Sequence, residues 1–216
     1  MSYFRSFLTS LLLFSLFPAT SSAFSLIDLI QPVQETMQND PQSRIQAWKK
    51  LIADTQTDSV WQKLNKVNRF FNQLKYVEDK TLWGVKDYWA TPVEFLTNNA
   101  GDCEDYAIAK YITLKALGVD VNRLRITYVM SSQAGQAHMV LVYLEGEAKT
   151  PLVLDNLSHD IEPMVSRTDL DPVYSFNHNG LWLATREVVS DQYVGSTQQV
   201  SLWQGLSGRL ARERFL

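Results

Sequence analysis

A cysteine, a histidine and an aspartate follow one another along the chain in an order that suits nucleophilic chemistry. Cys103 is the only cysteine among 216 residues, so it cannot form an internal disulfide. It follows a glycine turn and opens a segment, 103–117, that we predict to be a helix. The partial positive charge and free N–H groups of a helix N-terminus favour a thiolate. With His138 and Asp155, the set offers a nucleophile, a proton shuttle and a group that orients the shuttle.

Each of these residues also has an ordinary structural explanation. A lone cysteine on a helix is often a small buried hydrophobe, although the charged neighbours of Cys103 argue against burial. His138 suits the exposed face of a strand, since histidine is mostly partly exposed in proteins. Asp155 precedes Asn156 and suits a turn. The order of the three residue types, rather than any one of them, carries the hypothesis.

Three carboxylates surround the cysteine, namely Asp102, Glu104 and Asp105. Negative charge beside a thiol raises its pKa and opposes nucleophilic attack. A bound cation resolves this difficulty, because carboxylate oxygens are the hard ligands that Ca²⁺ prefers. The spacing is not that of an EF-hand, and acidic residues in the first turn of a helix also stabilise it without any ion. Both explanations of the acidic group remain open on chemistry alone.

The segments after the cysteine helix predict the strands that position the other two residues. Gly118 is the expected helix stop, and alternating apolar residues predict strands over 124–130, 137–144 and 151–154. His138 lies near the start of the second strand and Asp155 follows the third. Neighbouring antiparallel strands lie about 4.8 Å apart, which brings a carboxylate within reach of an imidazole.

Helices dominate the first half of the chain and strands the second. We expect helices over 24–54, interrupted near Pro41 where Asp40 can serve as the cap, over 59–77 and over 92–98. A hairpin is expected over 174–184, with its turn at Asn179-Gly180. The predicted fold class is therefore α+β, with N-terminal helices followed by an antiparallel sheet.

The pattern of the first 23 residues predicts a segment that is cleaved off and does not belong to the fold. Residues 1–23 combine one positive charge, an apolar stretch over 7–17 and the small residues Ser21-Ser22-Ala23, which is the pattern of a secretory signal peptide. The apolar stretch is short for a membrane span, so an uncleaved anchor is the less favoured alternative. Residues 24–216 are then expected to form one domain. A net charge of −3 gives no argument for nucleic-acid binding.

Four segments resemble the bacterial transglutaminase-like cysteine proteinases: 87–95 (DYWATPVEF), 101–110 (GDCEDYAIAK), 138–141 (HMVL) and 154–156 (LDN). The resemblance runs from about residue 61 to residue 182. It implies a papain-like, transglutaminase-like cysteine protease fold, with Cys103 as nucleophile, His138 as general base and Asp155 as the orienting acid. It further implies Ca²⁺ beside the cysteine, held by Asp102 and Glu104, with Asp105 as a third candidate ligand.

The resemblance also implies a biological setting. The expected enzyme is a periplasmic endopeptidase that cuts the N-terminal region of a large surface adhesin near a di-alanine site and so disperses biofilm. An inner-membrane receptor for cyclic di-GMP is the expected partner that sequesters it. A transglutaminase or amidase would use the same three residues, because all pass through a thioester and differ only in the acceptor. A catalytically silent partner-binding module is the alternative from another class.

Overall fold

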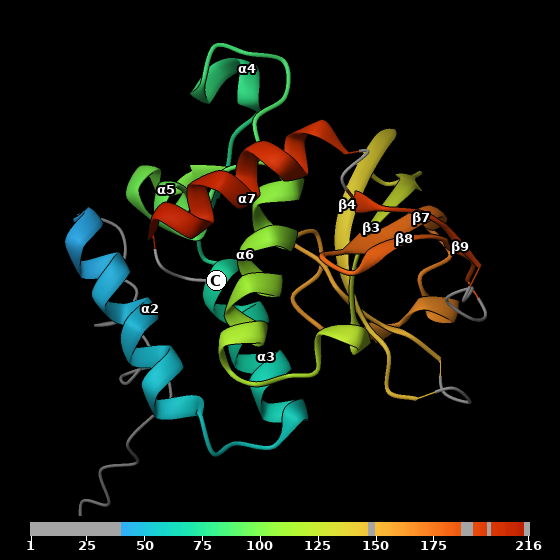
Figure 1. Ribbon diagram of the computed structural model, residues 1–216, viewed down its shortest axis with the longest axis horizontal. Helices are drawn as coiled ribbons and strands as arrows, with labels where there is room; N and C mark the ends of the chain where they lie inside the picture. Colours follow the sequence, from blue (N-terminus) through green and yellow to red (C-terminus); the bar gives the residue numbers. More distant parts are fainter. Residues whose placement is uncertain (1–39, 147–149, 187–191, 198–199, 214–216) are drawn as a thin grey trace, which may run out of the picture.

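The computed structural model describes residues 40–146, 150–186, 192–197 and 200–213. Helices form one half of this part of the molecule and an antiparallel sheet forms the other (Figure 1). The α+β class predicted from the sequence is confirmed. The expected signal peptide at 1–23 and the helix expected before residue 40 lie outside the described residues.

Six α-helices are described, and most begin where a polar side chain caps the first turn. They are α2 (Pro41–Thr55), α3 (Val60–Phe71), α4 (Asp79–Leu82), α5 (Pro92–Asn98), α6 (Cys103–Ala116) and α7 (Ser201–Glu213). The Asp40 carboxylate accepts the N–H of Ser43 at 2.8 Å, as the sequence predicts for this cap. Ser59 and Thr91 head α3 and α5 in reciprocal capping boxes. Short 3₁₀ turns are η1 (Val121–Arg123) and η2 (Met164–Ser166).

Seven strands form the main sheet in the order β6-β5-β4-β3-β7-β8-β9, with every neighbouring pair antiparallel. They are β3 (Leu124–Ser131), β4 (Gln136–Tyr143), β5 (Leu152–Leu154), β6 (Glu162–Pro163), β7 (Leu170–Asn177), β8 (Gly180–Leu183) and β9 (Tyr193–Gly195). A separate parallel pair joins β1 (Lys75–Tyr76) to β2 (Ala100–Gly101). Strand β2 lies just before Cys103. Its pairing with β1 links the turn that precedes the cysteine to the segment that follows α3.

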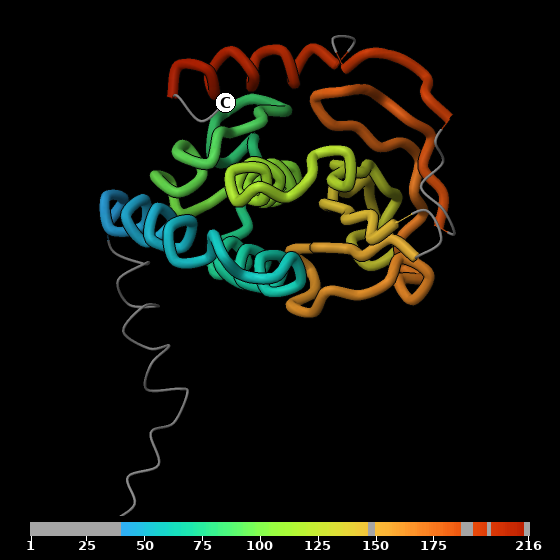
Figure 2. The backbone as a smooth tube through the Cα atoms, turned by 60° about the horizontal axis from the view of Figure 1, so that its bottom comes forward, coloured from blue at the N-terminus to red at the C-terminus, as the bar shows by residue number. Residues whose placement is uncertain are grey.

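Helix α6 is the centre of the core. Ten of its 14 residues are buried, because it packs against α3 and α5 on one side and against β3 and β4 on the other. A helix buried on all sides needs no polar face, which explains why apolar residues run through most of α6. Figures 1 and 2 place α7 alongside α5, across one end of the helical layer. The N-terminus of α6 therefore lies between the sheet and the helices.

Several boundaries differ from the sequence prediction for identifiable reasons. The helix predicted over 59–77 ends at Phe71, with Asn72 as its cap, and Lys75–Tyr76 instead forms β1. The apolar spacing continues past Phe71 because Leu74 is also buried, so periodicity alone extended the helix. Strands 124–130, 137–144 and 151–154 lie within one residue of β3, β4 and β5. Helices α4 and α7 and strands β6 and β9 were not predicted.

Candidate active site

The turn before Cys103 is built so that the cysteine becomes the first residue of α6. Asn99 ends α5 in the left-handed conformation, with φ 53°. A Cβ at Gly101 would lie 2.3 Å from Oδ2 of Asp105, so only glycine fits there. The same Asp105 oxygen accepts the N–H of Asp102, at 3.3 Å. These contacts fix the start of α6, and Cys103 stands there partly exposed, as the sequence predicts.

His138 and Asp155 form a buried pair on neighbouring strands. Nε2 of His138 lies 2.8 Å from Oδ1 of Asp155, and the two side chains are 4% and 0% exposed. Strands β4 and β5 pair Leu141 with Leu154, so Asp155, just beyond the end of β5, comes opposite Val140, two residues from His138 along β4. Because Nε2 is engaged, Nδ1 is the ring nitrogen left to exchange a proton. The strand argument that joined these two residues is confirmed by the geometry.

A third side chain, which the sequence did not reveal, holds the far side of Asp155. Arg167 Nη2 lies 2.7 Å from Oδ2 of Asp155, while the N–H of Leu157 binds Oδ1 at 3.0 Å. Arg167 is itself held by Asp169, at 2.7 Å. Burial alone would raise the pKa of Asp155, but the bonds from His138, Leu157 and Arg167 outweigh it and hold that pKa well below its ordinary value. Asp155 is therefore a fixed anion.

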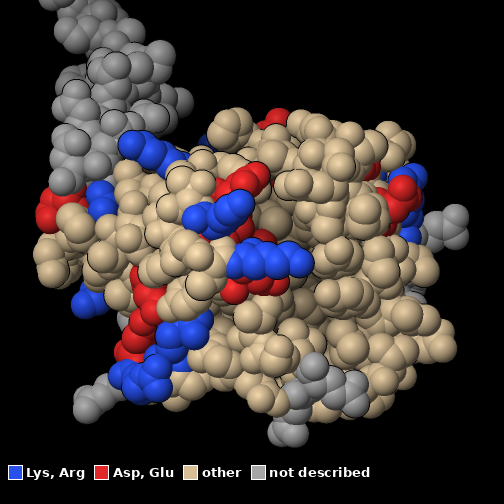
Figure 3. Space-filling view, turned by 90° about the horizontal axis from the view of Figure 1, so that it is seen from above, with Lys and Arg blue, Asp and Glu red and all other residues tan. Residues whose placement is uncertain are grey.

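Cys103 and His138 line the same cavity, which has a volume of about 630 Å³. The backbone N–H of Met139, which follows His138 on β4, tends to lower the pKa of the Cys103 thiol. One wall of the cavity is acidic and bears Glu78, Asp79, Asp87, Asp102 and Glu104, with Lys80 and Lys86; the other is aromatic and apolar and includes Trp89, Tyr128, Met139, Tyr174, Val200 and Leu202. Figure 3 shows acidic and basic side chains gathered beside a hollow on this face. A peptide could therefore approach the thiol from solvent.

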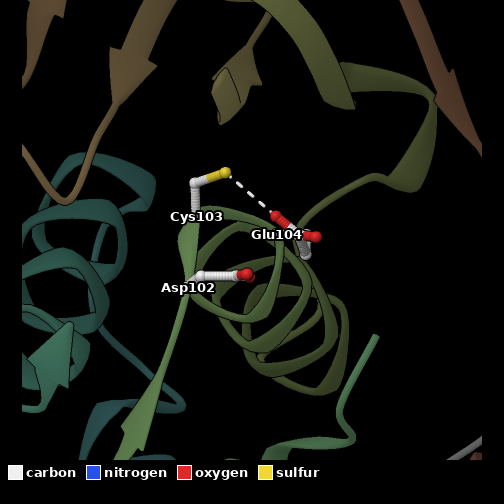
Figure 4. Close-up of side chains that lie close together, drawn as sticks. All are labelled: Asp102, Cys103 and Glu104. Atoms are coloured by element: carbon white, nitrogen blue, oxygen red, sulfur yellow. Dashed lines mark hydrogen bonds between the residues drawn. The ribbon is translucent and has the colours of Figure 1, made fainter. Parts of the chain in front are cut away.

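The thiol is coupled to the acidic wall. Sγ of Cys103 donates a hydrogen bond to Oε2 of Glu104, at 2.9 Å (Figure 4). Burial, followed by the charges of Glu104 and Asp102, raises the pKa of the Cys103 thiol. The expectation that the helix N-terminus favours a thiolate is thus overridden here, because burial and then the nearby carboxylates raise the pKa of the thiol. The structure therefore agrees with the concern raised by the sequence, namely that the carboxylates beside Cys103 oppose formation of the thiolate.

The carboxylates themselves are placed as cation ligands would be. Oxygens of Asp79, Asp87 and Glu104 lie within 4.8 Å of one another, and so do those of Asp79, Asp102 and Asp105. Oδ1 of Asp102 and Oδ1 of Asp79 are buried and have no hydrogen-bond partner among the described residues. Burial and then Glu104 raise the pKa of Asp102 to about 9. A cluster of carboxylates, two of which have a buried oxygen without a hydrogen-bond partner, suits a hard divalent cation that binds oxygen ligands.

Of the three acidic residues proposed from the sequence, Asp102 and Glu104 flank the thiol and Asp105 lies deeper. The Asp105 side chain is fully buried, contrary to the expectation that charge keeps this region exposed. Its Oδ1 accepts the N–H of Ala90, at 2.7 Å, and it also binds Asp102 as described above. Asp79 and Asp87 were missed, because no spacing in the sequence connects the segment around α4 with the cysteine.

The residues set aside in the sequence also have defined places. His159 lies exposed in the loop after β5, and His178 lies in the β7–β8 turn, where it binds the hydroxyl of Tyr111 at 2.9 Å. Lys110, two turns along α6 from Cys103, is fully buried, and its Nζ has no hydrogen-bond partner among the described residues. Trp89 is both a core residue, 5% exposed, and part of the cavity wall.

Comparison with known proteins identifies the family of the chain. A family model for the bacterial transglutaminase-like cysteine proteinases matches residues 35–186, about 70% of the chain, and ends before α7. The chain therefore belongs to this family and is a cysteine peptidase with a transglutaminase-like fold. A search of curated proteins found no match.

Solved structures of Legionella pneumophila LapG are similar to this chain along most of its length. One is 42% identical, with a TM-score of 0.70, and the alignment covers 85% of this chain and 97% of that one. An EGTA-treated form is 42% identical with a TM-score of 0.72, covering 85% and 97%. A calcium-bound form is 43% identical with a TM-score of 0.68, covering 85% and 98%. Across the described residues, no helix is long and apolar enough to cross a bilayer.

Proposed function

We propose that the chain is a periplasmic, calcium-dependent cysteine endopeptidase that cuts the N-terminal region of a large surface adhesin near a di-alanine site. The observation that carries the proposal is the cavity lined by both Cys103 and His138, whose imidazole is bound to buried Asp155. Release of the adhesin would free cells from a surface and disperse biofilm. The similarity to LapG supports a cysteine peptidase, and the substrate class is proposed from the resemblance of the four motif segments.

The catalytic residues act in a defined order. His138 Nδ1 takes the proton of the Cys103 thiol as Sγ attacks the peptide carbonyl carbon. The imidazolium then returns this proton to the departing amine, and a thioester remains on Cys103. Water attacks the thioester with His138 as the base again, releasing the acid product and the thiol. Asp155, fixed by Arg167, orients the imidazole and stabilises its charged form.

Calcium is proposed to bind at the acidic wall. Asp102 and Glu104 are the ligands proposed from the sequence, with Asp105 in support, and the structure adds Asp79 and Asp87 to the candidates. The calcium-bound and EGTA-treated forms of the Legionella protein support the choice of this ion. Bound Ca²⁺ would neutralise the carboxylates that raise the pKa of the thiol. The chain's own contribution is a cluster of five acidic side chains, two of which, Asp102 and Glu104, lie beside the thiol.

The cellular setting follows from the predicted signal peptide at 1–23, which would direct the chain to the periplasm. The proposed partners are the adhesin and an inner-membrane receptor that senses cyclic di-GMP and sequesters the protease. Nucleic acid is not a proposed partner. The acceptor in the second step is proposed to be water, and an amine acceptor would make the enzyme a transglutaminase instead.

One experiment tests the proposal directly. The purified mature chain is incubated with N-terminal regions of candidate adhesins, with Ca²⁺ or with EGTA, and new termini are mapped by mass spectrometry. We expect one cut at a di-alanine site, present with Ca²⁺ and absent in EGTA. A fluorescent amine is included, and its incorporation without cleavage would point to the transferase. Binding without cleavage or incorporation would point to the silent module.

A further inference from the structure

The segment 87–91 connects the acidic wall with the C-terminal helix, although it has no regular secondary structure of its own. On its inner side it binds two acidic side chains and carries a third, Asp87. The N–H of Tyr88 donates to Oδ2 of Asp79, and the N–H of Ala90 donates to Oδ1 of Asp105, at 2.7 Å. The orientation of these carboxylates therefore depends on where segment 87–91 lies.

On its outer side the same segment is held by α7. The guanidinium of Arg209 donates to the carbonyl of Trp89 and stacks over the ring of Tyr88, with 4.6 Å from Cζ to the ring centroid. Its Nε lies 3.3 Å from Oε2 of Glu94. Near the end of α7, Glu213 accepts the hydroxyl of Thr91, at 2.7 Å. Arg209 thus contacts the carbonyl of Trp89, the ring of Tyr88 and the carboxylate of Glu94.

Aromatic packing fixes the two sides relative to each other. The ring of Trp89 stacks on Phe176 of β7, with centroids 5.5 Å apart and planes 9° from parallel. Trp203 of α7 packs edge-on against the same ring of Phe176, with centroids also 5.5 Å apart. Val200 and Leu202, at the start of α7, line the cavity that contains the thiol. Helix α7 is consequently part of the surroundings of the site.

We infer that Arg209 is a positioning residue for the calcium ligands, acting from α7 through segment 87–91 on Asp79, Asp87 and Asp105. The inference rests on the proposed function, because it takes the acidic wall to be the calcium site. Groups that orient metal ligands typically change metal affinity about 10- to 100-fold when they are lost. Arg209 is the contact that joins the Trp89 carbonyl, the Tyr88 ring and Glu94, so its loss would let the backbone of the segment shift and misalign the carboxylates.

The test compares three variants of the mature chain by calorimetric titration with CaCl₂. Arg209→Gln removes the charge and the fork of donors, and we expect its Kd for Ca²⁺ to rise about tenfold. Arg209→Lys keeps charge and bulk, so it should fold normally; we expect an intermediate Kd, because lysine cannot bind the carbonyl and Glu94 together. Arg212→Gln, one turn on and exposed, is the matched control and should bind Ca²⁺ as the wild type does.

A second readout separates positioning from a general structural role. The rate of Cys103 alkylation by iodoacetamide is measured against Ca²⁺ concentration, and Tm is measured in EGTA. For Arg209→Gln we expect a calcium midpoint shifted about tenfold upward, with the wild-type alkylation rate recovered at saturating Ca²⁺. An unchanged Kd in both Arg209 variants, even with lowered Tm, would overturn the inference alone. No heat of binding in the wild type would instead overturn the calcium site, and the inference with it.

Discussion

The thiol of Cys103 donates its hydrogen bond to Glu104, the next residue along α6, at 2.9 Å. The thiol proton is thus directed to an acidic side chain whose own pKa is raised by burial. Charge on that carboxylate opposes thiolate formation, whereas its neutralisation would allow the proton to move to His138. We therefore expect the acidic wall, as well as the imidazole, to influence the reactivity of the thiol.

Replacement of the nucleophile should abolish cleavage without unfolding the chain. We expect Cys103→Ala and Cys103→Ser to lower kcat/KM roughly 10³-fold or more, since neither can form the thioester at a useful rate. The side chain is small and partly exposed, so circular dichroism and Tm should match the wild type. Comparable cleavage by the Cys103→Ala protein would refute the assignment of this thiol.

Loss of the imidazole should be more severe than loss of the group that orients it. We expect His138→Ala to lower kcat about 10²- to 10⁴-fold and to remove the acid limb of the pH–rate profile. Asp155→Asn should cause a smaller but large loss, because the ring remains but loses its fixed orientation.

His178→Ala is the control for this pair, since that ring lies in the β7–β8 turn, away from the cavity-lining residues. It should retain the wild-type profile. Full activity in His138→Ala, together with a loss in His178→Ala, would transfer the role of base to His178.

Arg167 should matter for both rate and stability. We expect Arg167→Met to lower kcat about tenfold with little change in KM, as for other groups that orient a working side chain. Its side chain is 6% exposed, so leaving Asp155 without this partner should cost about 3 kcal/mol of unfolding free energy. Arg186→Met breaks a 2.6 Å pair with exposed Asp171 and, as the matched control, should cost no more than about 1 kcal/mol.

The same variant should change the acid stability. The folded pKa of Asp155 lies below its unfolded value, so the carboxylate stabilises the fold above that unfolded value, and this contribution is lost as the pH falls through the folded pKa. Removing Arg167 raises the folded pKa and moves the loss to higher pH. Urea titrations between neutral and strongly acidic pH would show it; coincident curves for both proteins would contradict the ion pair.

The calcium ligands that the sequence did not reveal can be tested individually. We expect Asp87→Asn and Asp79→Asn each to weaken Ca²⁺ binding about tenfold or more, while Tm in EGTA stays the same or rises because repulsion within the carboxylate cluster is relieved. Asp54→Asn on α2, whose side chain is 57% exposed, is the control and should leave the affinity unchanged. Calorimetry against CaCl₂ and MgCl₂ measures both affinity and ion preference, with Ca²⁺ expected to bind more tightly. Unchanged affinity in both variants would restrict the site to Asp102, Glu104 and Asp105.

Lys110 should destabilise the fold in a pH-dependent manner. Burial, partly offset by the attraction of Asp155, lowers the pKa of Lys110 from 10.5 to about 7. Between these values the unfolded chain binds more protons, so unfolding free energy falls as pH decreases from about 10 to about 7 and then levels off. Lys110→Met should therefore be more stable by a few kcal/mol at neutral pH, but not above about pH 10.

Lys115→Met, on the partly exposed end of the same helix, is the control for the lysine variant. It should show the pH dependence of the wild type. A Lys110→Met protein that is less stable than the wild type at pH 7 would mean that the ammonium has a favourable partner in solution.

The sequence predicted the local features of the site better than the long-range ones. Cys103 at a helix start and Asp155 at a strand end follow from turn residues and alternation, and antiparallel pairing then joins Asp155 to His138. Arg167, Asp79 and Asp87 reach the site from loops and a short helix, where no periodicity marks them. Arg209 lies far along the chain from Trp89, and only tertiary packing brings them together. The sequence placed the end of α3 too far along the chain. Leu74 lies in a turn but is buried, so its apolar spacing matched that of a longer helix.

The division of the site between the two halves of the fold has a consequence for biosynthesis. Cys103 belongs to the helical half, whereas His138, Asp155 and Arg167 follow in the sheet, and α7 comes last. During synthesis from the N-terminus, the thiol is made first and its base, anchor and outer support arrive later. We therefore expect a chain that ends before the sheet to lack peptidase activity, because its thiol would have no imidazole beside it.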